Sequence, residues 1–257
     1  MPELAVDTRV NVWCLPLLWR LEGSASASGS REGEDAALER MTAMLSPEEK
    51  AVAAGIDSLD RRRSYVAAHA LLRSILGKVA GVAPNELVFR YGQRGKPELA
   101  GPGPVQQNLQ FNMSHSRDVM LVAVTHGRRV GVDIEHIDEP GDVRRIAARF
   151  LSPRDRDAIE QLPAERQRDA FLRCWTRKEA YMKARGDGIS RPLDDFEVGD
   201  APDAYRQPRL LQVSGDPNEV ERWGLADVPA PRGFMAAIAV EGRGFEVVQH
   251  SDWTGDV

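Results

Sequence analysis

The chain has few features that would place it in a membrane or in an oxidising compartment. It has only two cysteines, Cys14 and Cys174, which are far apart and fit neither a disulfide framework nor a metal-ligand spacing. No segment approaches the roughly 20 apolar residues of a transmembrane helix. The apolar run at 10–19 is preceded by more acid than base, whereas a secretory signal starts positive. We therefore expect a cytoplasmic protein without a membrane partner.

Aromatic residues are also scarce, at 6%, and the formal net charge is -5. The charge is uneven, because five Lys or Arg and no acid lie between Arg61 and Lys78, while 14 acids face 6 bases from Gly186 to the C-terminus. A basic patch on an acidic protein attracts anions. The overall acidity and the lack of aromatics near the patch argue against nucleic acid as a partner. A small phosphorylated ligand fits better.

The first part of the chain predicts a polar loop followed by helices. Residues 23–34 are small and polar, which is typical of a flexible loop. Ser46 before Pro47 predicts the N-cap of a helix, and a longer helix is expected at 60–77. The apolar face of that helix would leave four bases partly free, although a solvated basic face is an equal alternative. These bases are Arg62, Arg63, His69 and Arg73.

The order of predicted elements repeats along the chain. A helix, a short strand at 86–91 and an apolar strand at 119–125 are followed by a helix at 168–185, a short strand at 195–198 and an apolar strand at 234–240. We expect an α+β fold built as a pseudodimer of two similar subdomains. Their expected bounds are 1–127 and 128–257, with the active site between them.

Two carboxylates are predicted to share one face of a strand at 130–135. Side chains alternate along a strand, so Asp133 and Glu135 project to the same side, while the apolar residues between them indicate that the other side is buried. Two neighbouring carboxylates repel each other, and a hard divalent cation keeps both ionised. An exposed strand edge is the alternative, and metal binding is favoured over it.

A second pattern lies in the helix that contains Trp175, Glu179 and Lys183. Glu179 and Lys183 are four residues apart, so they lie on one face, with Trp175 one turn earlier. By spacing alone this predicts a surface ion pair worth about 0.3–0.5 kcal/mol. Beside a site with two carboxylates, however, Glu179 could add a third oxygen ligand and Lys183 a cation for a phosphate. Gly186 is expected to end the helix.

Two loops add polar groups. The segment 94–97 places Arg94 and Lys96 around Gly95, where the backbone can approach an anion. The segment 111–116 offers Ser114 and His115, but adjacent residues rarely have the geometry of a catalytic triad and no Gly-x-Ser-x-Gly elbow is present. A hydrolase nucleophile is therefore not predicted.

Taken in order, these motifs resemble the phosphopantetheinyl transferase superfamily, in particular its surfactin-synthetase-activating type. The resemblance covers roughly Ser46 to Val240 and implies the pseudodimeric fold of that family. The motifs are Gly95-Lys96-Pro97, Phe111-Asn112-x-Ser114-His115-Ser116, Gly131-Val132-Asp133-Ile134-Glu135 and Trp175-x-x-Lys178-Glu179-x-x-x-Lys183 with Gly186-x-Gly188.

The resemblance also implies ligands for these positions. Asp133, Glu135 and Glu179 would coordinate Mg²⁺, for which Mn²⁺ can substitute, together with the pyrophosphate of coenzyme A, and Lys183 would contact that pyrophosphate. The remaining nucleotide contacts would come from Arg94, Gly95, Lys96, Ser114 and His115, with contributions from Arg63 and His69. Upstream the match is weaker, because Val52 stands where relatives have a base, with Lys50 nearby.

By the same resemblance, the expected reaction moves phosphopantetheine from coenzyme A to a serine of an apo acyl or peptidyl carrier protein. Adenosine 3',5'-bisphosphate leaves, with Lys183 as the group that stabilises or protonates it and Glu179 as the candidate base, directly or through water. Ligand and base roles compete at Glu179, and another base stays possible. A monomer is expected, and the basic stretch 144–185 could meet an acidic carrier helix.

Two rival functions share these residues. A metal-dependent phosphohydrolase could use Asp133, Glu135 and His136, and a non-catalytic module could bind nucleotide or carrier protein with the same fold. A binding module would not need every acidic and lysine position of both metal motifs. The transferase is therefore favoured.

Overall fold

The computed structural model describes residues 7–17, 31–92, 94–138, 141–186, 188, 191–200 and 208–250, except for the side chains of residues 31, 32, 34 and 200. Its first elements are β1 (Arg9–Pro16), α1 (Arg31–Ala43), α2 (Pro47–Ala54), α3 (Leu59–Ala80), η1 (Pro84–Glu86), β2 (Val88–Tyr91), β3 (Pro97–Ala100), α4 (Pro104–Asn108), β4 (Leu109–Ser116) and β5 (Val119–His126). They continue with β6 (Val130–His136), α5 (Val143–Phe150), α6 (Pro153–Glu160), α7 (Ala164–Arg185), η3 (Leu193–Asp195), β7 (Phe196–Asp200), β8 (Pro208–Val213), α8 (Glu219–Arg222), β9 (Trp223–Asp227), β10 (Phe234–Glu241) and β11 (Glu246–His250).

Two halves of the chain build the same arrangement. In the first half β1, α3, the β2–β3 pair, β4 and β5 follow one another, and in the second half β6, α7, the β7–β8 pair, β9 and β10 do so. Both long helices have 22 residues, and the strand orders β1-β5-β4 and β6-β10-β9 correspond. The predicted α+β fold with two similar halves is therefore confirmed.

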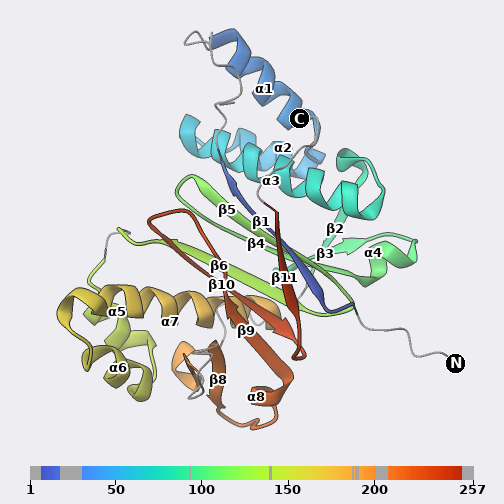
Figure 1. Ribbon diagram of the computed structural model, residues 1–257. Helices are drawn as coiled ribbons and strands as arrows, with labels where there is room; N and C mark the ends of the chain where they lie inside the picture. The colour runs from blue at the N-terminus through green and yellow to red at the C-terminus, as the bar shows by residue number, and fades with distance from the viewer. Residues whose placement is uncertain are drawn as a thin grey trace, which may run out of the picture.

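The halves stack as layers with the helices outside. Helix α3 lies on the four-stranded sheet with α1 and α2 packed against α3, and α7 crosses the three-stranded sheet with α5 and α6 beside it (Figure 1). Each helix layer packs an apolar core against its own sheet. A third core joins the two sheets and includes Val12, Leu121, Val132 and Ile238, all fully buried. Both sheets are thus covered on each side, and β5 is buried along almost all of its length.

The last described strand crosses back to the first half. β11 pairs with β1 in parallel, with Val10 opposite Val247, so the four-stranded sheet has the order β11-β1-β5-β4. Trp13 of β1 stacks on His250 of β11 with ring centroids 4.6 Å apart. Residues from the two ends of the sequence therefore share one sheet.

The two sheets meet where β4 and β6 lie side by side, which we call the seam. Between β4 and β6, hydrogen bonds from the backbone of β6 go to alternate side chains of β4, and not to the backbone of β4. The amide oxygen of Asn112 accepts a hydrogen bond from the Val132 N–H at 2.9 Å, and the Ser116 hydroxyl accepts one from the His136 N–H at 3.1 Å. The polar side chains of β4 thereby satisfy backbone donors of β6 that no strand covers.

Local signals explain where the helices begin and end. Ser46 and Glu49 form a reciprocal capping box at the start of α2, which confirms the predicted helix start. Gly81 and Gly186 end α3 and α7 in the left-handed conformation, with φ of 68° and 74°. This is the geometry that glycine adopts without a steric penalty, and it is the end predicted for α7.

Several expectations about the first half need correction. The loop expected at 23–34 is a helix from Arg31 onward, and residues 23–30 lie outside the described part. Arg73 was expected to be partly free, but it is 1% exposed, because its guanidinium binds Glu49 and the carbonyls of Pro84 and Leu87. Cys174 is buried. None of the described helices is long and apolar enough to cross a membrane.

Candidate functional site

Asp133 lies in the middle of β6 and faces α7. Val130, Val132 and Ile134 point into the core between the sheets, so the odd-numbered residues take the opposite side. At Gly131 that side has no room, since a Cβ would come within 2.2 Å of the Ala180 carbonyl oxygen. The absence of a side chain at Gly131 therefore lets α7 pack close to β6, which brings the last turns of α7 over Asp133.

One oxygen of Asp133 accepts two hydrogen bonds, one from α7 and one across the seam from β4. The Lys183 ammonium lies 2.6 Å from Asp133 Oδ1, and the Ser114 hydroxyl donates to the same oxygen at 2.9 Å. Lys183 also lies 2.9 Å from the Ser114 oxygen. Lys183 therefore pairs with a strand residue 50 positions away. Spacing along the helix predicted Glu179 as its partner instead.

The other oxygen of Asp133, Oδ2, is buried and has no hydrogen-bond partner among the described residues. Burial raises the pKa of Asp133, which outweighs the lowering effects of Lys183 and Ser114. A buried carboxylate oxygen that lacks a donor is costly unless a ligand or a cation reaches it. Asp133 is therefore the residue here that most needs a further positive partner.

Glu179 stands beside this group on α7. Its pKa is raised by burial and then by the negative charge of Asp133, while Lys183 acts in the opposite direction. Glu135 is two residues beyond Asp133 on β6, and its carboxylate accepts a hydrogen bond from Ser116 at 3.4 Å. A buried carboxyl group whose pKa is raised further by a neighbouring negative charge is the pattern that a cation relieves.

No group of three His, Cys, Asp or Glu side chains lies close enough to hold a metal within the described residues. The three carboxylates predicted as ligands are therefore not assembled into a ready-made three-ligand cage. Mg²⁺ is commonly bound by one or two carboxylates together with water and substrate phosphates. The unpartnered Asp133 oxygen and the neighbouring Glu179 fit such a site.

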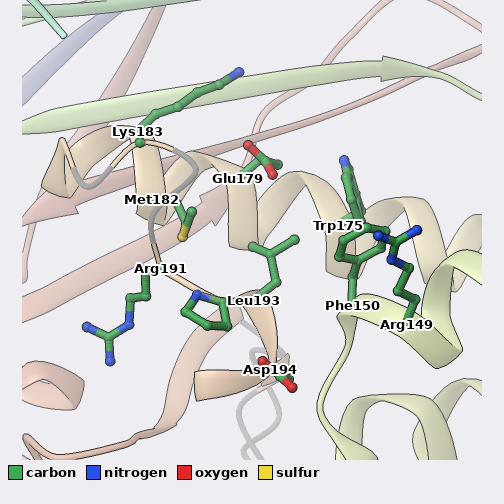
Figure 2. A pocket seen from close by; sticks show the side chains of 11 residues that line it. Arg149, Phe150, Trp175, Glu179, Met182, Lys183, Arg191, Leu193 and Asp194 are labelled. Carbon is green, nitrogen blue, oxygen red and sulfur yellow. The ribbon is translucent and has the colours of Figure 1, made fainter. Parts of the chain in front are cut away.

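A cavity of about 630 Å³ opens next to Glu179 and Lys183. Trp175, Glu179, Met182 and Lys183 of α7 line it, together with Leu193 and with Phe150 at the end of α5. In Figure 2 Met182 lies on the side of Leu193, whereas the Lys183 side chain extends away from it. The walls are mainly apolar, and Phe150 meets Trp175 edge to face, with centroids 6.1 Å apart. The cavity can take an extended, partly apolar group whose charged end lies at Lys183.

Lys178 fixes one wall of this cavity from behind. It is fully buried, its ammonium lies 2.7 Å from Asp155 Oδ2, and it donates to the carbonyls of Leu193 and Phe196. The motif position next to Glu179 is thus a structural ion pair that joins α7 to α6 and to η3. Sequence reasoning gave Lys178 no role, although a lysine among buried positions of an amphipathic helix was a possible signal.

His115 lies on the first half's side of the site, and much of its surface is exposed. Partial burial of its imidazole lowers the pKa of His115, and the positive charges of Lys183 and His69 lower it further. His69 is held by Glu49, whose Oε1 is 3.1 Å from His69 Nδ1, and stacks on Tyr65. His69 therefore influences the pKa of His115, and Arg63 lies half-buried on the same helix as His69.

The predicted phosphate-binding turn 94–97 has a different arrangement. Gly95 has φ of 84°, and Arg94 is exposed. The Lys96 ammonium donates to the carbonyls of Val130 at 2.9 Å and Ala184 at 3.0 Å. Burial, followed by the charge of Arg129, lowers the pKa of Lys96 to about 8. Lys96 is thus tied to the backbone of the second half.

The structure gathers Ser114, Asp133, Glu179 and Lys183 at the seam, with His115 near them. Sequence reasoning quoted Asn112 and Ser116 in a motif but gave them no role, and it expected 111–116 to be a loop, whereas these residues belong to β4 and join the seam beside Ser114. A polar residue at every second position of β4, at 112, 114 and 116, was the available signal, because it marks one strand face.

Comparisons with known proteins give a consistent picture. The family model described as "4'-phosphopantetheinyl transferase superfamily" matches residues 129–227, and the one described as "4'-phosphopantetheinyl transferase, N-terminal" matches residues 32–127. The chain is 34% identical over 246 residues to 4'-phosphopantetheinyl transferase HetI of Nostoc sp., covering 95% of this chain and 93% of that protein.

A second relative is the putative 4'-phosphopantetheinyl transferase slr0495 of Synechocystis sp., at 30% identity over 73% of each chain. Among solved structures, a holo-(acyl-carrier-protein) synthase from Bacillus anthracis in complex with coenzyme A is similar over 44% of this chain and 96% of that one. The identity is 24% and the TM-score 0.35, which is too low to bear on the site.

Proposed function

Because this chain belongs to the 4'-phosphopantetheinyl transferase superfamily, we propose that the seam between its halves is where phosphopantetheine passes from coenzyme A to a carrier-protein serine. The family resemblance in the sequence motifs is confirmed by these comparisons, and the chain is an enzyme of the transferase class. The serine oxygen forms a bond to the β-phosphorus and loses its proton. The bond between the β-phosphorus and the oxygen that bridges it to the α-phosphorus breaks, and adenosine 3',5'-bisphosphate leaves with that oxygen.

Asp133 and Glu179 are the proposed first ligands of Mg²⁺, with Glu135 as a third on the same strand face. The observation that carries this assignment is the buried Asp133 oxygen without a donor, beside a second carboxylate whose pKa is raised. When bound, the ion would neutralise pyrophosphate charge and the charge that builds up on the leaving oxygen. We expect Mn²⁺ to substitute, since the donors are all oxygens.

Lys183 is the proposed contact to the pyrophosphate. Its side chain is 31% exposed, so it can reach a ligand in the cavity, while Ser114 and Asp133 hold the ammonium at the edge of the seam. A positive charge fixed at that position favours the more negative leaving group over the intact diphosphate. Lys183 can also supply a proton to the leaving oxygen.

Glu179 is the proposed base for the carrier serine. Burial and the Asp133 charge raise its pKa, which makes its carboxylate a stronger proton acceptor than a free glutamate. A bound cation would lower the pKa again, so the ligand and base roles compete at Glu179. Glu179 lines the cavity, so its carboxylate can meet a hydroxyl that enters from there. The apolar walls around it exclude water from competing with the serine.

The cavity beside Glu179 is the proposed place for the pantetheine arm. That arm is an extended chain of amides and methylenes, which suits a mainly apolar space of about 630 Å³ with its charged end at Lys183. Trp175 and Phe150 would contact the arm, and Leu193 would form the opposite wall. A shortened arm should therefore lose binding through these contacts.

The nucleotide end of coenzyme A is proposed to lie over the first half. His115 is exposed next to Lys183, and His69 is close enough to influence its charge. Arg63 and Arg94 are the arginines predicted for the phosphates, and a Cβ at Gly95 would meet nothing within 4 Å, so the turn leaves room for close approach. The partners would be coenzyme A and apo acyl or peptidyl carriers, for an enzyme acting as a monomer in the cytoplasm.

The decisive experiment measures the intact mass of the carrier. The purified protein is incubated with coenzyme A, Mg²⁺ and each of several apo carrier proteins, and the carriers should gain the mass of phosphopantetheine. A Ser→Ala carrier is the matched control and should gain none. Release of phosphate without a carrier would favour the hydrolase rival, and failure of every carrier to gain mass would contradict the transferase proposal.

A further inference from the structure

Lys96 spans the junction between the two halves. It comes from the turn after β2 in the first half, yet its ammonium donates to Val130, the first residue of β6, and to Ala184, near the end of α7. These two elements carry the proposed ligands Asp133 and Glu179. One charged side chain therefore binds the starting point of the strand and the final turn of the helix.

The Ala184 carbonyl needs such a donor. The last four carbonyls of an α-helix have no partner within the helix, and a cation at this end also interacts favourably with the helix dipole. Gly186 ends α7, but its N–H bonds to the carbonyls of Met182 and Lys183. The Ala184 carbonyl is therefore satisfied by Lys96, which acts as a cap supplied from the other half.

The aliphatic part of Lys96 also contacts the second half, at Gly186. A Cβ on Gly186 would lie 3.4 Å from Lys96 Cδ, so the chain of Lys96 lies against the backbone at the helix end. Gly188 stands in the same way against Arg94, with 3.3 Å from its Cβ position to the Arg94 carbonyl oxygen. The turn 94–96 and the segment after α7 thus fit against each other along several atoms.

We infer that Lys96 is a positioning residue that holds α7 and β6 together so that Glu179 and Lys183 face Asp133, and that it does not bind a phosphate of coenzyme A. This inference rests on the proposed function of those three residues. A lysine with two backbone acceptors and a packed stem would have to break both bonds to reach an anion. The phosphate contacts are then left to the other basic residues of the site.

The structural half of the test needs no reaction. Hydrogen exchange measured by mass spectrometry should be about tenfold faster in K96M than in the wild type for peptides covering 129–134 and 180–186, which is the effect of one lost charged hydrogen bond. Peptides from β8 serve as an internal reference and should not change. K78M is the matched control on the exposed end of α3, and its exchange at 180–186 should equal that of the wild type.

Two further variants keep the inference testable if K96M folds poorly. K96R retains the charge and can donate to the same carbonyls, so it should recover part of the protection. G186A adds a methyl group against the Lys96 stem at a positive φ, so it should loosen the same two peptides while Lys96 itself is unchanged. Unchanged exchange in K96M at both peptides would overturn the inference.

The kinetic half of the test compares coenzyme A with dephospho-coenzyme A, which lacks the 3'-phosphate. A positioning residue affects both substrates alike. The ratio of the K96M KM to the wild-type KM should therefore be the same, within about twofold, for coenzyme A and for dephospho-coenzyme A, while kcat falls with both substrates. A penalty of about tenfold or more that appears only with coenzyme A would instead assign Lys96 to the phosphate. If the wild type transfers nothing, the proposed function fails, but the exchange measurement still decides the role of Lys96.

Discussion

The Lys183 ammonium and the Asp133 carboxylate form an ion pair of 2.6 Å that joins the last turns of α7 to the middle of β6. Asp133 is almost completely buried, whereas Lys183 keeps about a third of its side chain exposed. The pair therefore has one fixed partner and one partner that can turn toward a ligand. The fixed partner should matter for chemistry more than for folding.

Asp133→Asn tests this separation. The substitution keeps the shape and removes the charge, so the proposed metal position and the fixed partner of Lys183 are both lost. We expect turnover to fall by about a hundredfold or more, because one interaction with transition-state charge is worth a few kcal/mol. The free energy of unfolding should change by no more than about 1 kcal/mol, since Asn no longer carries a charge that is costly to bury.

Carrier modification is followed by mass spectrometry, and stability by urea unfolding. Asp169→Asn is the matched control, because Asp169 is exposed on α7 and lines a different cleft. A rate close to that of the wild type in the Asp133 variant would show that the metal and its ligands have been assigned to the wrong residues.

The side of β6 on which Asp133 lies was predicted correctly, because side chains alternate along a strand. Alternating apolar residues at 130, 132 and 134 fix which side of β6 is buried between the sheets, and Asp133 must then take the other side. The long helices were predicted for a similar reason, and the helix expected at 168–185 is α7, which begins four residues earlier. The short helices α5 and α6 and the strand β11 have too few periodic residues to be recognised.

The partners of Lys183 and Lys96 could not be predicted, since they depend on how the halves are packed. Spacing along the helix offers Glu179 to Lys183, but the tertiary fold places Asp133 closer to the ammonium. For Lys96 the acceptors are two backbone carbonyls, which leave no mark in the sequence. Arg73 was expected to be partly free for the same reason, but it is buried and forms an ion pair with Glu49.

Glu49 should make stability depend on acid. Burial tends to raise its pKa, but hydrogen bonds from His69, Arg73 and the Ser46 N–H outweigh this effect and lower the pKa to about 2. A depressed pKa means that the stabilisation is fully present above the ordinary value of 4.5 and is lost as the pH falls toward 2. The loss should be on the order of 3 kcal/mol.

The measurement is urea unfolding between pH 7 and pH 2.5 for the wild type and Glu49→Gln. Gln cannot titrate, so the variant should be less stable at pH 7 and should lack this part of the decline in acid. Glu39→Gln is the control, because Glu39 is an exposed glutamate of α1. Parallel declines in the wild type and in Glu49→Gln would contradict the assignment.

Lys178 and Asp155 should behave as a coupled buried pair. The ammonium is fully buried and lies 2.7 Å from Asp155 Oδ2, which also accepts a hydrogen bond from Ser152. Lys178→Met alone leaves a buried carboxylate without its cation and should cost about 3–5 kcal/mol. Lys178→Met combined with Asp155→Asn removes both charges and should recover at least about 1 kcal/mol of that loss. Additive effects in a double-mutant cycle would show that the two charges do not depend on each other.

Gly131→Ala should separate the two elements that carry the site. The added Cβ would lie 2.2 Å from the Ala180 carbonyl oxygen and from the Ala184 nitrogen, both of which belong to the backbone of α7. Backbone atoms cannot rotate away as a side chain can, so α7 must move off β6, at a cost of at least about 2 kcal/mol. Glu179 and Lys183 move with the helix, and transfer should fall even at temperatures where the variant is folded.

Gly55→Ala is the matched control, because its Cβ would meet only ordinary contacts of 3.5 Å or more. Urea unfolding and the rate of carrier modification are measured on both variants, and equal results for the two would mean that close packing of α7 on β6 does not position the site.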